Sequence, residues 1–146
     1  MRSVRVLAVD DFEPWLHFVS QELRSSPRFQ IVDSASDGLE AVQKAQKLQP
    51  DLIVLDIGLP KLNGIEAARQ IRNVSANSKI LFLSETYSPD IAAAALASGG
   101  SGYVLKSDAG TDLCAAAEAV IQGRQFVSAT LSRHDLTDTT NAQKYA

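Results

Sequence analysis

Four short apolar runs of this 146-residue chain are each followed at once by side chains that could do chemistry. These are three carboxylates, one hydroxyl and one ammonium: Asp10, Asp11, Asp56, Ser84 and Lys106. Carboxylates held close together repel one another, which raises the pKa of at least one of them unless a cation is present. Mg²⁺ prefers oxygen ligands of this kind and shares them with phosphate oxygens. A lysine supplies a mobile positive charge suited to phosphate.

The set therefore favours phosphoryl transfer, in which catalysis is mainly positioning and charge neutralisation. The sequence has no glycine-rich phosphate loop and no dinucleotide fingerprint. We therefore expect the phosphoryl group to arrive on another molecule, with one aspartate as its covalent acceptor. Taken alone, Asp56 is explained equally well as a turn residue before Pro60.

The elements that must position these residues follow from hydrophobic periodicity. Five apolar, β-prone segments alternate with stretches of helical spacing, and the segments are Val4 to Val9, Phe29 to Val32, Leu52 to Leu55, Ile80 to Leu83 and Gly102 to Leu105. This order predicts an α/β fold: a doubly wound, five-stranded parallel sheet, flavodoxin-like (βα)5, with strand order 2-1-3-4-5. The carboxyl ends of strands 1, 3, 4 and 5 then crowd together, where such sheets place their ligands.

Local signals support the helices between the strands. Asp37 and Asn63 are candidate N-caps, and Pro14 fits the first turn of the first helix. We expect one domain over residues 1–125. From residue 126 to residue 146 the chain is predicted to be a polar C-terminal tail or linker.

Composition limits the classes of function. Hydrophobic residues make up 45% and charged residues 21%, as in ordinary globular proteins, and the net charge is −3. No long basic run is present, which disfavours direct nucleic-acid binding. No apolar stretch is long enough to span a bilayer and no signal-peptide pattern is seen, so we expect a cytoplasmic protein without membrane contact. The single cysteine excludes an internal disulfide framework.

The chain resembles the response-regulator receiver domains of two-component signalling, which are CheY-like. Four segments together carry the resemblance: Val9-Asp10-Asp11, Leu55 to Pro60 with Asn63-Gly64, Leu83-Ser84, and Tyr103 to Lys106. It implies that Asp56 accepts the phosphoryl group from a histidine kinase. It also implies that Asp10, Asp11, Asp56 and the backbone carbonyl of Gly58 hold Mg²⁺.

The resemblance further assigns the remaining site residues. Ser84 would bind a phosphate oxygen and move toward it, and Lys106 would pair with the phosphate. Tyr103 would be an aromatic switch that turns inward as Ser84 moves, and an ordinary half-buried strand aromatic is the alternative. The face of helix 4, strand 5 and helix 5 would read the two-state equilibrium and could form a homodimer.

Segments 64–69, 106–107 and 123–128 most resemble the NarL/FixJ subfamily, whose receivers precede a LuxR-type helix-turn-helix domain. Transcriptional control, and any contact with DNA, would then require an output domain that is not in this chain. A stand-alone receiver, or an interaction module independent of phosphorylation, is the alternative. We expect no enzyme activity beyond self-phosphotransfer and autodephosphorylation.

Two positions depart from the family pattern. Ser107 stands where many members have proline. A residue other than proline is common at this position in the DNA-binding subfamily. Glu85 follows Ser84, where the residue is usually small. We expect its carboxylate to add negative charge near the phosphate and to alter the rate of phosphotransfer or autodephosphorylation.

Overall fold

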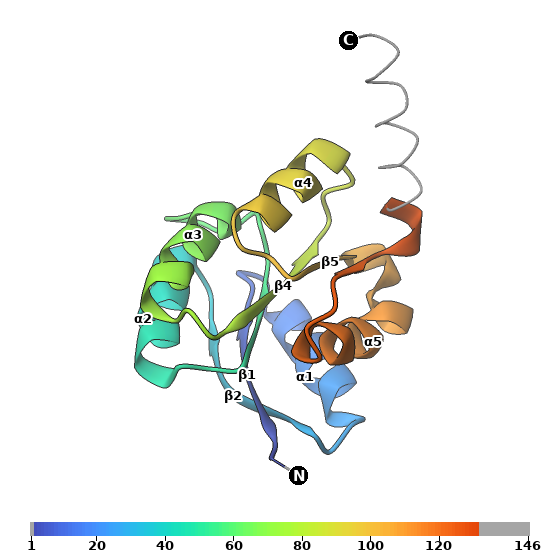
Figure 1. Ribbon diagram of the computed structural model, residues 1–146, viewed down its shortest axis with the longest axis horizontal. Coiled ribbons are helices and arrows are strands. Elements are labelled where there is room, and N and C mark those ends of the chain that lie inside the picture. Colours follow the sequence, from blue (N-terminus) through green and yellow to red (C-terminus); the bar gives the residue numbers. More distant parts are fainter. Residues whose placement is uncertain (1, 132–146) are drawn as a thin grey trace, which may run out of the picture.

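The computed structural model describes residues 2–131 and contains one parallel sheet with helices on both faces (Figure 1). The strands are β1 (Val4–Val9), β2 (Phe29–Ala35), β3 (Leu52–Leu55), β4 (Lys79–Ser84), β5 (Gly102–Leu105) and β6 (Phe126–Val127). The helices are α1 (Glu13–Arg24), α2 (Gly38–Leu48), α3 (Gly64–Val74), α4 (Pro89–Ala97) and α5 (Ala109–Ile121), with a 3₁₀ turn η1 (Lys106–Asp108) before α5.

The sheet has the order β2-β1-β3-β4-β5-β6, and every neighbouring pair is parallel. The predicted α/β class and the order 2-1-3-4-5 are therefore confirmed, but the prediction of five strands was wrong. The sixth strand begins at residue 126, the first residue of the segment that we expected to be tail or linker. It pairs with β5 because Gly102 and Tyr103 present backbone groups that would otherwise lie at an open edge.

Alternate residues along each central strand enter two different cores, because successive side chains of a strand point to opposite faces. In β3, Ile53 and Leu55 join one core, whereas Leu52 and Val54 join the other. The first core packs against α2, α3 and α4, and the second packs against α1 and α5. Burial on both faces explains why these strands are continuous apolar runs.

The predicted capping residues begin their helices. The side chain of Asp37 accepts a hydrogen bond from the backbone N–H of Glu40 at α2, and Asn63 accepts one from Glu66 at α3. Both helices start beside the carboxyl edge of the sheet, so the caps also fix the loops that border this edge.

The chain after α5 turns back onto the body of the domain. Ser128 and Leu131 are fully buried, and Leu131 belongs to the same core cluster as Tyr103 and Ala95. Beyond residue 131, the rest of the expected tail lies outside the described residues. Among residues 2–131, no helix has the length and apolar character that crossing a bilayer requires.

Candidate functional site

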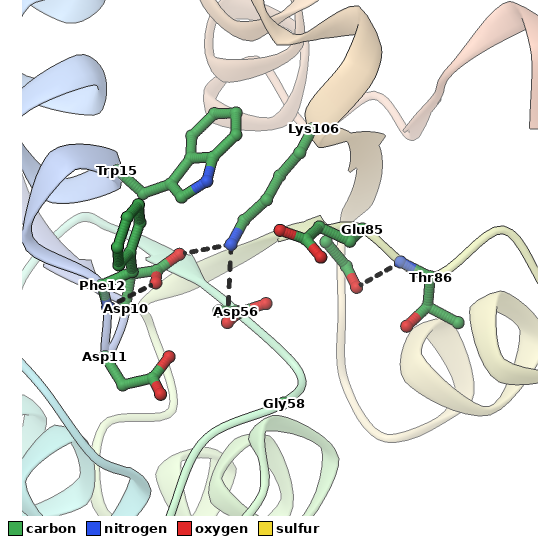
Figure 2. Close-up of a pocket in the computed structure, with 10 residues that line it drawn as sticks. Asp10, Asp11, Phe12, Trp15, Asp56, Gly58, Glu85, Thr86 and Lys106 are labelled. Carbon is green, nitrogen blue, oxygen red and sulfur yellow. Dashed lines mark hydrogen bonds and ion pairs between the residues drawn. The ribbon is translucent and has the colours of Figure 1, made fainter.

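The site residues predicted from the sequence, except Tyr103, meet in one pocket of about 240 Å³ at the carboxyl edge of the sheet (Figure 2). Strands β1, β3 and β4 and the turn after β5 each deliver their terminal side chains to it. The lining residues are Asp10, Asp11, Phe12, Trp15, Asp56, Gly58, Ser84, Glu85, Thr86 and Lys106. Parallel strands bring these positions together because their carboxyl ends lie at the same edge of the sheet.

Three carboxylates form the centre of the pocket. Asp10, Asp11 and Asp56 each offer an oxygen, and these atoms all lie within 4.8 Å of one another. Asp10 and Asp56 are buried, whereas Asp11 is exposed. The Oδ1 atom of Asp10 accepts from the backbone N–H of Phe12 at 2.9 Å, and Oδ1 of Asp56 accepts from that of Ile57 at 2.8 Å. Each buried carboxylate is thus fixed through one oxygen.

The backbone at Asp56 is held from two sides. Its N–H donates to the carbonyl oxygen of Val9, which continues the pairing of β1 and β3. On the other side, α3 begins so close to it that a Cβ atom on Gly64 would lie 2.0 Å from the Asp56 carbonyl oxygen. Glycine is therefore required at position 64, and it lets α3 begin directly beneath the acidic residue.

Burial raises the pKa of Asp56 above its ordinary value, and the neighbouring charge of Asp10 raises it further. Lys106 acts in the opposite direction, but its influence does not cancel the other two. The ionised form of Asp56 is thus disfavoured by its surroundings. A cation placed among the three carboxylates would relieve this cost.

The donor set fits a small divalent cation with a preference for oxygen. Three carboxylates converge from separate elements, and Gly58 lies in the same lining with open space around its Cα. Mg²⁺ takes one or two carboxylates, keeps several waters and accepts phosphate oxygens at its remaining positions. The chemistry of the site is therefore compatible with Mg²⁺ held by Asp10, Asp11 and Asp56.

Lys106 reaches into the pocket from the turn after β5 (Figure 2). Its Nζ lies 2.7 Å from Oδ2 of Asp10 and 3.6 Å from Oδ2 of Asp56. Its side chain is only 6% exposed, so both ion pairs are shielded from water. Buried pairs of this kind are strongly coupled, because removing one member leaves an uncompensated charge.

Ser84 and Tyr103 are connected through the backbone of one residue, Thr86. The Oγ atom of Ser84 accepts from the N–H of Thr86 at 3.0 Å, and the Tyr103 hydroxyl donates to the Thr86 carbonyl at 3.0 Å. Tyr103 is fully buried, and burial raises the pKa of its hydroxyl. Its ring therefore already has the inward orientation, in contact with the loop that follows Ser84.

Three residues of the pocket were not given a site role from the sequence. They are Phe12, Trp15 and Thr86. Phe12 is 57% exposed at the pocket rim. Helical spacing alone could not reveal this, because the rim is defined by β1, β3 and the turn after β5. Glu85 does line the pocket, as its place after Ser84 predicted.

The sequence model of the response regulator receiver domain family matches residues 6–118. Among curated relatives, the transcriptional regulatory protein DegU of Brevibacillus brevis is 32% identical over 125 residues, which is 86% of this chain and 53% of DegU. The chain spans about half the length of the curated relatives it matches.

Solved structures agree with the sequence match. A LuxR-family two-component response regulator from an Aurantimonas species has a TM-score of 0.90 and 30% identity, covering 94% of this chain and 99% of that one. The isolated receiver domain of RcsB from Salmonella enterica, solved with the phosphomimetic BeF3−, has a TM-score of 0.84 and 26% identity, covering 90% and 98%.

Proposed function

Because this chain belongs to the response regulator receiver domain family, we propose that it is a phosphorylation switch that carries the phosphoryl group on Asp56. One observation carries the proposal: the three carboxylates and the Lys106 ammonium share a single pocket. A domain that serves only as an interaction scaffold has no need of this mutually repelling set of acids, two of which are buried.

The Asp56 carboxylate is the nucleophile. Its Oδ1 is engaged by the Ile57 N–H, which orients the group, while Oδ2 faces Lys106. In the transfer, a bond forms between an Asp56 oxygen and phosphorus as the bond from phosphorus to the donor histidine nitrogen breaks. The electron pair of that bond stays on the departing imidazole, which takes up a proton. The donor is a sensor histidine kinase.

Asp10 and Asp11, with Asp56 and the Gly58 carbonyl, hold Mg²⁺. When bound, the ion neutralises the negative charge of the carboxylates and of the phosphoryl oxygens. When Asp56 is phosphorylated, the Lys106 ammonium leaves Asp10 and pairs with a phosphoryl oxygen. This movement is short, because Nζ already lies 3.6 Å from Oδ2 of Asp56. Electrostatic positioning of this kind supplies most of the catalysis in phosphoryl transfer.

Ser84 and Tyr103 couple the phosphoryl group on Asp56 to a conformational change of the α4–β5–α5 face. When Ser84 donates to a phosphoryl oxygen, its Oγ leaves the Thr86 N–H, and the Thr86 carbonyl loses its fixed position against Tyr103. The phosphoryl group thus biases a two-state equilibrium through contacts that differ between the states. The α4–β5–α5 face presents the result, either to a second copy of the chain or to an output element.

The output is control of transcription in the cytoplasm, exerted through a DNA-binding domain as in regulators of the LuxR type. The relatives support this, since DegU is a transcriptional regulatory protein of about twice the matched length. The chain's own net charge of −3 gives it no general attraction for DNA. Its catalysis is limited to its own phosphorylation and dephosphorylation.

Intact mass spectrometry tests the proposal. The protein is incubated with acetyl phosphate, with and without Mg²⁺, and compared with Asp56→Asn. We expect a single phosphoryl adduct that requires Mg²⁺ and is lost in Asp56→Asn. Asp90→Asn, which changes an exposed carboxylate at the start of α4, is the matched control and should retain the adduct. An adduct that persists in Asp56→Asn would overturn the assignment, and its absence from the wild type would favour a phosphorylation-independent interaction module.

A further inference from the structure

Trp15 is the only tryptophan of the chain, and it lines the acidic pocket from the first turns of α1. Its indole ring is partly buried and packs edge-on against Phe18, with ring centroids 5.2 Å apart and an interplanar angle of 75°. Phe18 itself packs against the second core cluster. The indole is therefore held by the body of the domain, although it borders the functional site.

The face of this ring meets the Lys106 ammonium. Nζ of Lys106 lies over the indole, 4.9 Å from the centroid, which is within the range of a cation–π contact (Figure 2). The ammonium thus has the carboxylates of Asp10 and Asp56 near it and an aromatic face against it as well. A lysine side chain has four carbons and many rotamers, and the indole limits those that Lys106 can adopt.

We propose that Trp15 is a positioning residue for phosphoryl binding, acting through Lys106 and resting on the function proposed above. Its fixed aromatic face keeps the ammonium over the pocket while the ammonium exchanges Asp10 for a phosphoryl oxygen. The same face excludes water from that side of the ammonium. Neither effect requires Trp15 to touch the phosphoryl group.

Because Asp10 is a predicted Mg²⁺ ligand, the position of Lys106 has a second consequence. An ammonium that stays on Asp10 competes with the cation, whereas one released into solvent no longer serves the phosphoryl group. The indole holds the ammonium at a position between Asp10 and the solvent. A cation–π contact leaves the N–H groups of the ammonium free to donate hydrogen bonds.

The first experiment tests the contact without any phosphoryl ligand. Trp15 emission is measured in the wild type, Lys106→Met, Lys106→Arg and the control Lys47→Met, which removes an exposed ammonium on α2. We expect Lys106→Met to change emission intensity or wavelength, Lys106→Arg to retain much of the wild-type signal, and Lys47→Met to have no effect. Identical emission in all four proteins would overturn the proposal.

The second experiment measures binding of beryllofluoride, a phosphoryl mimic, by calorimetry in the presence of Mg²⁺. We expect Trp15→Leu to weaken binding by about fivefold to tenfold, which is the range of one partly buried cation–π contact, and Trp15→Phe to restore most of it. In the Lys106→Met background, Trp15→Leu should have no further effect. Equal losses in Trp15→Leu and Trp15→Phe, or full additivity with Lys106→Met, would contradict a role through Lys106.

The two experiments separate this inference from the proposed function. If wild-type protein forms no adduct with acetyl phosphate and binds no beryllofluoride, the proposed function fails, while the emission data still decide whether Lys106 rests on Trp15. Thermal unfolding of each variant identifies loss of fold. Should Trp15→Leu not fold, Trp15→Met replaces it as the variant without an aromatic face, and the emission experiment is unaffected because it keeps Trp15.

Discussion

The Lys106 ammonium lies 2.7 Å from Oδ2 of Asp10, nearer than the 3.6 Å that separates it from Asp56. In this state the lysine thus lies closer to Asp10, a proposed metal ligand, than to Asp56, the proposed phosphoryl acceptor. Because Asp10 is also a proposed Mg²⁺ ligand, we expect binding of Mg²⁺ and release of Lys106 from Asp10 to be coupled.

Replacing Lys106 with methionine should raise the affinity for Mg²⁺ and lower the free energy of unfolding of the Mg²⁺-free protein. Removing a positive charge beside the carboxylates should raise Mg²⁺ affinity by about tenfold, measured by calorimetry. The same change leaves two buried carboxylates unpaired, so the free energy of unfolding in EDTA should fall by about 3 kcal/mol. Unchanged Mg²⁺ affinity would show that Lys106 and the ion do not compete for Asp10. Lys47→Met is again the exposed control.

Asp56→Asn should stabilise the metal-free protein at neutral pH. Because burial and Asp10 raise the pKa of Asp56, the folded protein keeps this proton to a higher pH than the unfolded chain does. The free energy of unfolding therefore falls as pH rises from the ordinary carboxyl value of 3.8 through the higher pKa of the folded state. Asparagine cannot ionise and avoids this loss, so the variant should be more stable than the wild type at pH 7.

Urea unfolding in EDTA across acidic to neutral pH checks this sign. The gain from Asp56→Asn should shrink as pH is lowered through the same window, since wild-type Asp56 then becomes neutral as well. A gain that is constant with pH would refute the electrostatic origin. Asp90→Asn should show no such pH dependence.

Gly64→Ala should destabilise the domain and disturb the acceptor site. A methyl group at this position would lie 2.0 Å from the Asp56 carbonyl oxygen, so α3 or the β3 terminus must shift. We expect a loss of about 1–3 kcal/mol in chemical unfolding, together with slower phosphorylation by acetyl phosphate. Gly110→Ala in α5, where the added methyl meets nothing within 4 Å, should instead gain up to about 1 kcal/mol.

Leu131→Ala should cost about 2–5 kcal/mol, because Leu131 is fully buried in the core cluster that contains Tyr103. Thermal and urea unfolding measure the change, with Ile91→Ala on the exposed side of α4 as the control. A change below about 0.5 kcal/mol would show that the segment after β6 contributes nothing to the fold.

The position of Asp56 was predictable because β3 is a continuous apolar run that ends abruptly in an acid. Strands buried on both faces produce this pattern directly, and parallel pairing then brings their ends together. Asp10, Ser84 and Lys106 were found by the same reasoning. Their meeting in one pocket is therefore a consequence of the order of the elements, and it needed no knowledge of side-chain conformation.

Trp15 and Tyr103 mark the limit of that reasoning. The partner of the Trp15 ring is set by the path of Lys106 from a turn ninety-one positions later in the chain, which the spacing of residues on α1 does not reveal. Likewise, the Thr86 carbonyl that receives the Tyr103 hydroxyl depends on the fold of the β4–α4 loop. Strand β6 was missed because two residues are too few to show periodicity, and only the edge of β5 makes them a strand.

The pairing of β6 with β5 determines how other proteins can approach this side of the sheet. The β5 backbone is already engaged: the Ser128 N–H donates to the Tyr103 carbonyl, and the Ser128 hydroxyl accepts from the Leu105 N–H. A partner cannot add a strand directly to β5, and β6 offers only the short edge of a two-residue strand. Among residues 2–131, this short edge limits edge-to-edge aggregation, and we expect recognition on this side to use side-chain contacts with α4 and α5.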